Sequence, residues 1–440
     1  MNPSGTFALA LAVGFGTSVA MWVVGFLGRF PAAPVPGAIL LPALLLLLVL
    51  GGVRAGRASR TGFRAGAAAG LVASLVNLLV LGSVIAGEST SGAVTWIPAS
   101  LLLGVLLGGA GGLLGRKLLS PVELEPTFEL AKVAAAATLF LLALGGLVTT
   151  EGAGLTVVDW PNSYGSPMFL FPLARMVGGI YYEHSHRLFG SLVGFVTLVL
   201  AIRLLMTESR GALKAMGLGA LALVIVQGVL GGLRVTGHFT WSTSPADTRP
   251  SLALAMVHGA TGQIFFAFMV ALVAVASRTW RDAPRPAADR SAAATDRLLS
   301  AVLVGVILVQ LLLGIRVRHL GEGVMAHVTF AVIVLLTAIS VGIRTVGQHR
   351  RIPALRKTGG ALMGHAATQF LLGGLALVAL TRARDHGTGL FETLAMTAHQ
   401  TVGALLLANA ALLALWTRRL LPAPADGATP AAESPAPARS

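Results

Sequence analysis

Residues 181–187 read YYEHSHR and stand at the start of a long apolar segment of this 440-residue chain. A carboxylate, two imidazoles and a guanidinium are costly to place at the start of a membrane helix, so such a cluster is a candidate functional site. Glu183 and His186 are three residues apart, which puts both side chains on one face of a helix.

Four histidines mark an internal repeat. His186 and His258 are separated by 72 residues, and so are His327 and His399. Each member of the second pair lies 141 residues after its counterpart. A repeat that carries its own ligand-type side chains predicts two structural units of the same kind.

The composition is that of a membrane protein. Hydrophobic residues make up 55% of the chain and charged residues only 11%, far less charge than a soluble domain carries. Apolar runs of about 20 residues are long enough to cross a bilayer. The runs lie approximately at 6–28, 36–53, 63–87, 94–115, 128–150, 184–206, 211–233, 251–277, 297–315, 323–345, 358–381 and 390–416. The predicted fold is thus an all-α membrane protein with about 12 transmembrane helices, and the first run is expected to be retained rather than cleaved as a signal peptide.

The basic residues are distributed unevenly between the loops. Of the 32 Lys and Arg residues, 22 lie in alternate loops and in the C-terminal tail, and eight lie in the other loops. The positive-inside rule then places both termini in the cytoplasm and residues 181–187 on the outer side of the cell membrane. The net charge of +15 is explained by this bias, so the lipid bilayer is the expected partner and nucleic acid is not.

The repeat divides the chain into units. The pattern Gln-x-x-Leu-Gly-Gly-Leu occurs at 227–233 and 369–375, ahead of His258 and His399. Two tandem pseudo-repeated four-helix bundles in the same orientation are expected, preceded by four extra helices. The first unit has 28 additional residues in its first outer loop. The expected parts are an N-terminal region over 1–120, a first unit over 128–280, a second unit over 296–417 and a disordered tail over 422–440.

The histidine pairs suit a haem. A single intramembrane histidine is usually structural, but four at repeat-related positions favour ligation. Two helices that face each other across a bundle can each present an imidazole to a metal between them. Because the chain has no cysteine and no clustered acids in these spans, haem with two axial histidines is the expected cofactor. His186 would pair with His258, and His327 with His399.

Arginines and the remaining histidines are further polar residues near the predicted sites. Haem propionates favour cations near the water boundary, and the arginines at that level are Arg187, Arg234, Arg316 and Arg318. The same arginines could simply anchor the interface. His238, His319 and His386 are expected in loops, His184 on a different helix face from His186, and His365 remains an open question.

The two units differ beside the histidines. Glu183 lies three residues before His186, whereas the residue three before His327 is Val324. A carboxylate near a bound haem could take up protons, stabilise a positive charge that develops on a substrate, or form an ion pair with Arg187. If both haems only carried electrons, the difference would have little purpose.

The sequence resembles the haem A synthases over about 128–417. The resemblance is carried by residues 145–147 (GGL), 152–155 (GAGL), 159–161 (DWP) and 182–187 (YEHSHR), and by the order and spacing of the four histidines. The chain departs from the family in three ways: it lacks the arginine that often follows the first Gly-Gly, it has no cysteine pair in the outer loop, and it has four extra spans.

The resemblance implies a reaction. The first unit would bind haem O as substrate and oxidise its C8 methyl group to a formyl group, giving haem A, with Glu183 as the catalytic residue. The second unit would hold a haem b that moves electrons. His186, His258, His327 and His399 would be the haem ligands, and haem O synthase and terminal oxidase assembly proteins possible partners. The alternatives are a non-catalytic bis-histidine b-type cytochrome that transfers electrons, and a haem-handling assembly protein.

Overall fold

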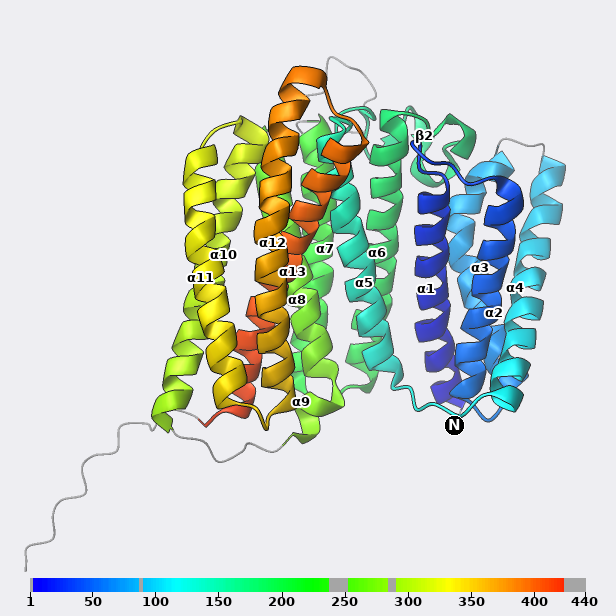
Figure 1. The fold of residues 1–440 in the computed structure, drawn as a ribbon. Coiled ribbons are helices and arrows are strands. Elements are labelled where there is room, and N and C mark those ends of the chain that lie inside the picture. Colours follow the sequence, from blue (N-terminus) through cyan, green and yellow to red (C-terminus); the bar gives the residue numbers. More distant parts are fainter. Residues whose placement is uncertain (1–2, 87–89, 237–251, 284–289, 423–440) are drawn as a thin grey trace, which may run out of the picture.

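The computed structural model describes residues 3–86, 90–236, 252–283 and 290–422. Nearly all of this part of the chain is helical, and the long helices run side by side (Figure 1). Among the described residues, twelve helices are long and apolar enough to cross a membrane. The prediction of an all-α, multi-pass membrane protein is therefore confirmed.

The N-terminal group contains four of these helices, packed closely through glycine. Its members are α1 (Pro3–Gly28), α2 (Gly37–Arg57), α3 (Gly62–Ala86) and α4 (Thr90–Leu118). A Cβ atom on Gly66 would lie 2.1 Å from the carbonyl oxygen of Gly108, so a larger residue cannot be accommodated without moving a backbone. Without a hydrophobic force between helices in lipid, such close approach is what holds membrane helices together.

The remaining long helices form two bundles. The first contains α5 (Pro126–Thr150), α6 (Gly179–Thr207), α7 (Gly211–Thr236) and α8 (Leu252–Ala276); after the short α9 (Arg278–Asp282), the second contains α10 (Arg290–Leu320), α11 (Val324–Gln348), α12 (Pro353–His386) and α13 (Leu390–Leu420). In each bundle every helix packs against the next and the last packs against the first. The bundles meet where α13 contacts α5 and α8, and where α10 contacts α8.

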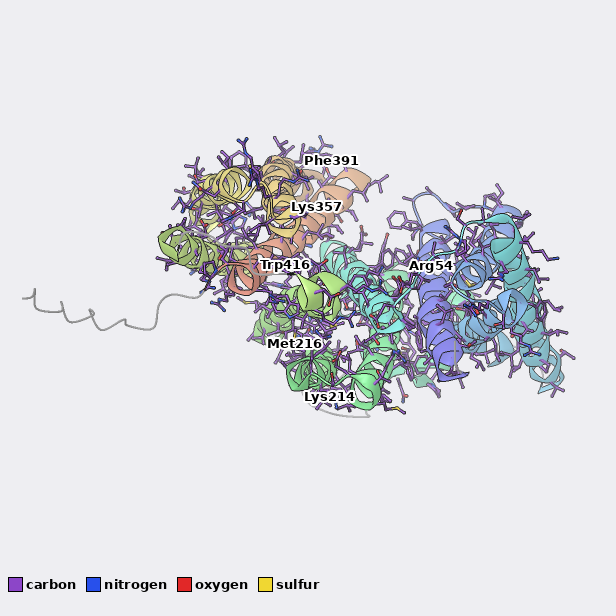
Figure 2. All side chains as sticks on the ribbon, turned by 90° about the horizontal axis from the view of Figure 1, so that it is seen from below. Arg54, Lys214, Met216, Lys357, Phe391 and Trp416 are labelled. Carbon is purple, nitrogen blue, oxygen red and sulfur yellow. The ribbon has the colours of Figure 1, made fainter. Side chains whose placement is uncertain are left out.

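The three groups of helices are arranged in a row. Viewed along the helices, the N-terminal group stands beside the first bundle, and the second bundle stands on the far side of it (Figure 2). The junctions are marked by side chains near the same ends of the helices: Arg54 forms an ion pair with Glu129 of α5 at 2.5 Å, and Trp416 of α13 packs on Trp280 at 5.4 Å between ring centres. One core cluster of buried side chains spans α1 and the first bundle, and another spans α8 and the second bundle.

Residues 151–178 connect α5 to α6 and have their own structure; we call them the outer segment, after the side of the membrane on which the sequence predicts them. It contains the strands β1 (Asn162–Ser163) and β2 (Ser166–Pro167) and the 3-10 turns η1 (Met168–Leu170) and η2 (Leu173–Arg175). Tyr164 and Gly165 form the hairpin turn, with φ of 50° and 77°, and both backbone N–H groups donate to the carboxylate of Asp159 at 2.8 Å. Burial raises the pKa of the Tyr164 phenol, which stays neutral and donates to the carbonyl of Thr156.

Two expectations about loops are wrong. His319 lies in the last turn of α10 and His386 in the last turn of α12. Both helices continue past the apolar run because basic side chains interact favourably with the C-terminal end of the helix dipole. His238 and residues 423–440 of the expected tail lie outside the described residues.

The orientation in the membrane remains a prediction that cysteine labelling can test. Val177 in the outer segment is 65% exposed, and Ser209, between α6 and α7, is exposed as well. In intact cells, Val177→Cys should react with a membrane-impermeant maleimide, whereas Ser209→Cys should react only after permeabilisation. The parent chain has no cysteine, so its labelling is the background control. The reverse pattern would overturn the orientation.

Candidate functional site

The four repeated histidines form two pairs of facing rings. His186 of α6 faces His258 of α8 with 6.4 Å between ring centres and 87° between ring planes. His327 of α11 faces His399 of α13 with 6.2 Å and 84°. The structure thus brings together the side chains that the sequence predicted to pair, and gives both pairs nearly the same geometry.

The distance between the two ring centres of each pair is that expected for two imidazoles bound to one metal atom between them. A metal lies roughly 2 Å from an imidazole nitrogen, and that nitrogen lies roughly 1.1 Å from the ring centre, so two axial rings have centres roughly 6 Å apart. The observed separations are 6.4 and 6.2 Å. The described residues contain no group of three or more His, Cys, Asp or Glu side chains that could hold a metal ion. A haem iron needs only two protein ligands, because the porphyrin supplies the other four.

Each histidine ring lies against a glycine on the preceding helix. A Cβ atom at these glycines would lie 3.0 to 3.6 Å from Cε1 of the ring, so the imidazole occupies the space of a missing side chain. The contacts are Gly145 with His186, Gly231 with His258, Gly314 with His327 and Gly373 with His399. The first glycine of the repeated Leu-Gly pattern therefore positions a histidine in all four cases.

The second glycine of the pattern has a different use at each place. Gly232 lies beneath the ring of Trp160, whose Cδ2 would be 2.4 Å from an added Cβ. Gly146 faces Thr397 and Gln400 of α13, with 3.2 Å to the Thr397 methyl group. An added Cβ at Gly374 would meet no atom within 4 Å. In the first unit, Gly232 therefore makes room for the outer segment and Gly146 makes room for the second bundle; neither contacts a histidine of the pairs.

The ring nitrogens fit a pair of ligands. The Nδ1 atoms of His186, His258 and His399 are buried and have no hydrogen-bond partner among the described residues. In the second pair, glutamine amides approach the rings: Gln310 Nε2 lies 3.1 Å from His327 Nδ1 and 3.4 Å from its Nε2, and Gln369 Nε2 lies 3.4 Å from His399 Nε2. Buried polar atoms without partners are rare and call for a bound group or water. The two facing pairs are thus compatible with axial ligation of two haems.

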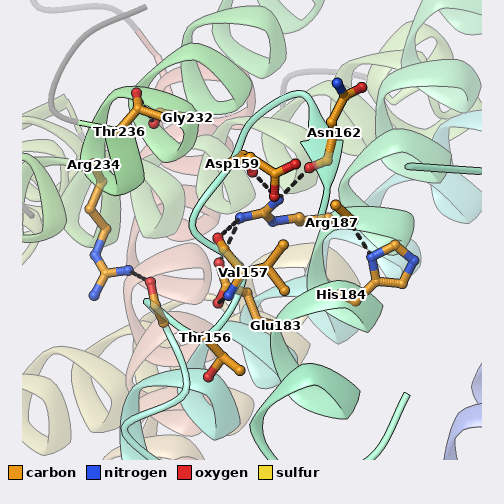
Figure 3. Close-up of polar contacts among 12 residues, drawn as sticks. Thr156, Val157, Asp159, Asn162, Glu183, His184, Arg187, Gly232, Arg234 and Thr236 are labelled. Atoms are coloured by element: carbon orange, nitrogen blue, oxygen red, sulfur yellow. Dashed lines mark hydrogen bonds and ion pairs between the residues drawn. The ribbon is translucent and has the colours of Figure 1, made fainter. Parts of the chain in front are cut away.

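Glu183 and Arg187 form a buried ion pair beside the first histidine pair. Arg187 Nη2 lies 2.8 Å from Glu183 Oε1, and the two side chains are only 9% and 5% exposed. The other carboxylate oxygen of Glu183 accepts from the backbone N–H of Val157 at 2.8 Å. The carboxylate therefore ties the start of α6 to the outer segment (Figure 3).

Arg187 completes this attachment through backbone carbonyls. Its guanidinium donates to the carbonyls of Asp159 at 2.6 Å and Asn162 at 3.0 Å, and to that of Val157. A planar guanidinium offers five donors in a fixed fork and suits such a network. These contacts hold the outer segment on α6; the expected contact of Arg187 with a haem stays a prediction.

The other arginines at this level have partners of several kinds. Arg316 pairs with Glu322 at 2.9 Å, and Arg234 donates to the carbonyl of Gly154. Arg318 donates to the Thr150 hydroxyl at 2.7 Å and to the Met396 sulfur at 3.3 Å. Neither Arg234 nor Arg318 forms an ion pair within the described part of the chain. Met396 is three residues before His399, so the Arg318 charge lies near the second pair.

His184 serves the outer segment rather than the histidine pair. Its Nδ1 lies 3.0 Å from the Ser163 hydroxyl, and its ring packs on Phe171. The side chain is 1% exposed, and it points away from the face that carries His186, as expected. The sequence did not predict Ser163 as the partner of His184, or the Val157 N–H as the partner of Glu183. These contacts join residues 21 and 26 positions apart, and no local motif marks them.

Residues 129–327 match the model of the COX15-CtaA family, whose description is cytochrome oxidase assembly protein. Over this stretch, which is less than half of the chain, the sequence is similar to that family. The match begins in α5 and ends at His327, so it includes the first histidine pair, Glu183 and Arg187. No curated protein matches the chain. The match supports a role in cytochrome oxidase assembly, and the resemblance predicted from the sequence is confirmed over these residues.

The attachment of the outer segment leads to a prediction about Arg187. Arg187→Lys keeps the charge opposite Glu183 but cannot reach the three carbonyls. Leaving buried acceptors without donors costs about 1–3 kcal/mol, which corresponds to roughly 5- to 150-fold more frequent local opening. Limited proteolysis should therefore cut residues 151–178 faster in this variant. Arg316→Lys alters an exposed pair and should leave the cutting rate unchanged. Equal rates in both variants would show that Arg187 does not hold the segment.

Proposed function

We propose that the protein is a haem A synthase that oxidises the C8 methyl group of haem O to a formyl group, for use in terminal oxidases. The observation that carries the proposal is an asymmetry between two otherwise similar sites. Both pairs of rings have the same spacing, but only the first has a buried carboxylate within one helical turn of a ligand candidate. Only the first also has the outer segment of 28 additional residues.

The two pairs would hold different haems. His186 and His258 would hold the substrate haem O, and His327 and His399 would hold a haem b. A bound haem b supplies reversible one-electron transfer. Conversion of a methyl to a formyl group removes four electrons from one carbon and adds one oxygen atom, which must come from water or dioxygen. Because a haem b holds one electron at a time, it would relay electrons between the site and a partner outside the protein. Arg318, which has no carboxylate partner among the described residues, would offer its charge to a propionate at the second site.

Glu183 would act through its charge. A fixed anion in a water-poor site stabilises positive charge that develops on a reacting carbon. Its oxygen atoms are held by Val157 N–H and Arg187, so the carboxylate is positioned before a substrate binds. Arg187 donates hydrogen bonds to the backbone carbonyls of Val157, Asp159 and Asn162 and so holds the outer segment against the start of α6. In this position the segment would limit the access of water to the first histidine pair.

One observation favours a second candidate function. Arg187 neutralises Glu183 in the structure, and a carboxylate whose charge is matched could be purely structural. The protein would then be a bis-histidine b-type cytochrome that passes electrons without changing a haem. Extraction and mass analysis of haem from cells that make haem O separates the two: a formyl haem supports the synthase, and two unmodified haems b support the cytochrome. Loosely held haem would indicate a haem-handling assembly protein.

The supply and use of the haem define the proposed partners. A haem O synthase would have to deliver the substrate within the membrane, and a terminal oxidase assembly protein would have to receive the product. Both exchanges suit a protein whose sites lie between membrane helices. The reaction also requires a partner, electron donor or acceptor, that exchanges electrons with the haem b.

The role of Glu183 can be tested by Glu183→Gln. This change removes the charge but keeps the shape of the side chain and one acceptor oxygen. Loss of one preorganised electrostatic group typically lowers the rate by about 10²–10³, so the variant should bind haem at both sites and make little haem A. Near-normal production of haem A would leave the ion pair with Arg187 as the whole role of Glu183. Loss of haem from both sites would show that the carboxylate is needed for folding.

The second site can be tested through adjacent glycines. Gly373→Val places methyl groups where the His399 ring lies, whereas Gly374→Val places them in open space. Gly373→Val should therefore lower the haem-to-protein ratio to about half and weaken the low-spin absorption, as should His327→Ala and His399→Ala. Gly374→Val should leave both measurements unchanged. A full haem content in the His327→Ala and His399→Ala variants would remove the assignment of these ligands.

A further inference from the structure

The first helix of the N-terminal group is attached to the start of α6 by aromatic rings. Phe26 stacks on Tyr181 with 4.9 Å between ring centres and 19° between planes. Phe30 meets the ring of Tyr182 at 6.2 Å. Phe26 is 6% exposed and Tyr181 is 3% exposed. Aromatic residues that anchor a protein at the membrane surface face the lipid, so this buried cluster has another purpose.

Polar contacts reinforce the attachment at the same level. The Tyr181 hydroxyl donates to the backbone carbonyl of Phe26, at the last turns of α1. Beyond the end of α1, Arg29 donates to the carbonyl of Leu173 in η2 at 2.9 Å. A second helix of the group takes part too, because α3 packs against η1. The N-terminal group thus contacts both the start of α6 and two turns of the outer segment.

The contacts lie next to the ion pair described above. Tyr181 and Tyr182 directly precede Glu183, whose carboxylate accepts a hydrogen bond from Val157 in another part of the outer segment. The first turns of α6 are therefore held by α1 on one side and by the outer segment on the other. A shift of this turn would move Glu183 and Arg187 together, because both side chains are fixed to the same short helical stretch.

We infer that the N-terminal four-helix group is a brace that keeps the outer segment seated on the first bundle. The other end of α5 is fixed to the same group, where Glu129 binds Arg54 at 2.5 Å. The brace acts on the first bundle. The second bundle packs separately against α5 and α8 of the first bundle. This role does not depend on which reaction the histidine pairs serve.

Cysteine reactivity in the folded, detergent-solubilised full chain tests the brace. Ser163→Cys reports on the outer segment, because Ser163 lies in β1 of that segment and is 0% exposed. Phe26→Ala removes the stacked ring and should raise the rate of maleimide labelling at position 163 by about tenfold or more. Tyr181→Phe keeps the ring and loses only the hydroxyl bond, so its effect should be much smaller.

Two controls separate a local effect from general loosening. Phe7→Ala makes the same change on the same helix, but Phe7 is 64% exposed, and this variant should label at the parent rate. Ser300→Cys, 1% exposed in the second bundle, should label slowly in every background. An unchanged rate at position 163 in Phe26→Ala would overturn the brace. A rise at positions 163 and 300 together would also overturn it, because the effect would then be global.

Arg29→Gln keeps the inference testable if Phe26→Ala does not fold. Arg29 is exposed, and its contact with the Leu173 carbonyl is not part of a core. The variant should fold and should raise labelling at position 163 by a few-fold, again without a change at position 300. Labelling at the parent rate in a folded Arg29→Gln variant would contradict the brace.

Discussion

An imidazole pressed against a glycine of the neighbouring helix is the contact on which both histidine pairs depend. It occurs four times, at Gly145, Gly231, Gly314 and Gly373. Membrane helices gain little from burying apolar surface against each other, so small residues that allow close approach decide how they pack. Here the absent side chain also leaves room for a histidine ring, whose centre lies 6.4 or 6.2 Å from that of its partner across the bundle. The spacing of the rings thus follows from helix packing rather than from loops.

Charge imposes the other constraint. A carboxylate and a guanidinium in a membrane helix are expensive unless they are paired and hydrogen-bonded. Glu183 and Arg187 meet this requirement with each other and with backbone groups of Val157, Asp159 and Asn162. The same bonds that make the charges tolerable attach the outer segment to α6. One set of contacts therefore both stabilises the buried charges and holds the outer segment in place.

The sequence predicted the parts of this arrangement that follow a period. The apolar runs located the membrane helices, and the separation of 72 residues within each histidine pair indicated which rings would face each other. It did not predict the hairpin of the outer segment, which depends on backbone N–H groups binding Asp159, or the contact of Phe26 with Tyr181, which are 155 residues apart. Contacts of that kind have no periodic signal. The ends of α10 and α12 were also misjudged, because hydropathy marks the edge of the bilayer and not the end of a helix.

The contacts between the two bundles have the form of an isologous dimer interface. With α10–α13 taken as the counterparts of α5–α8, α8 packs against its own counterpart α13, and the contacts of α5 with α13 and of α10 with α8 are equivalent. Two separate copies related by a two-fold axis would meet in this way. In a true homodimer every substitution is made twice, so neither half can specialise alone. Joining the halves in one chain removes that restriction, and the carboxylate, the outer segment and the N-terminal helices are all attached to one half.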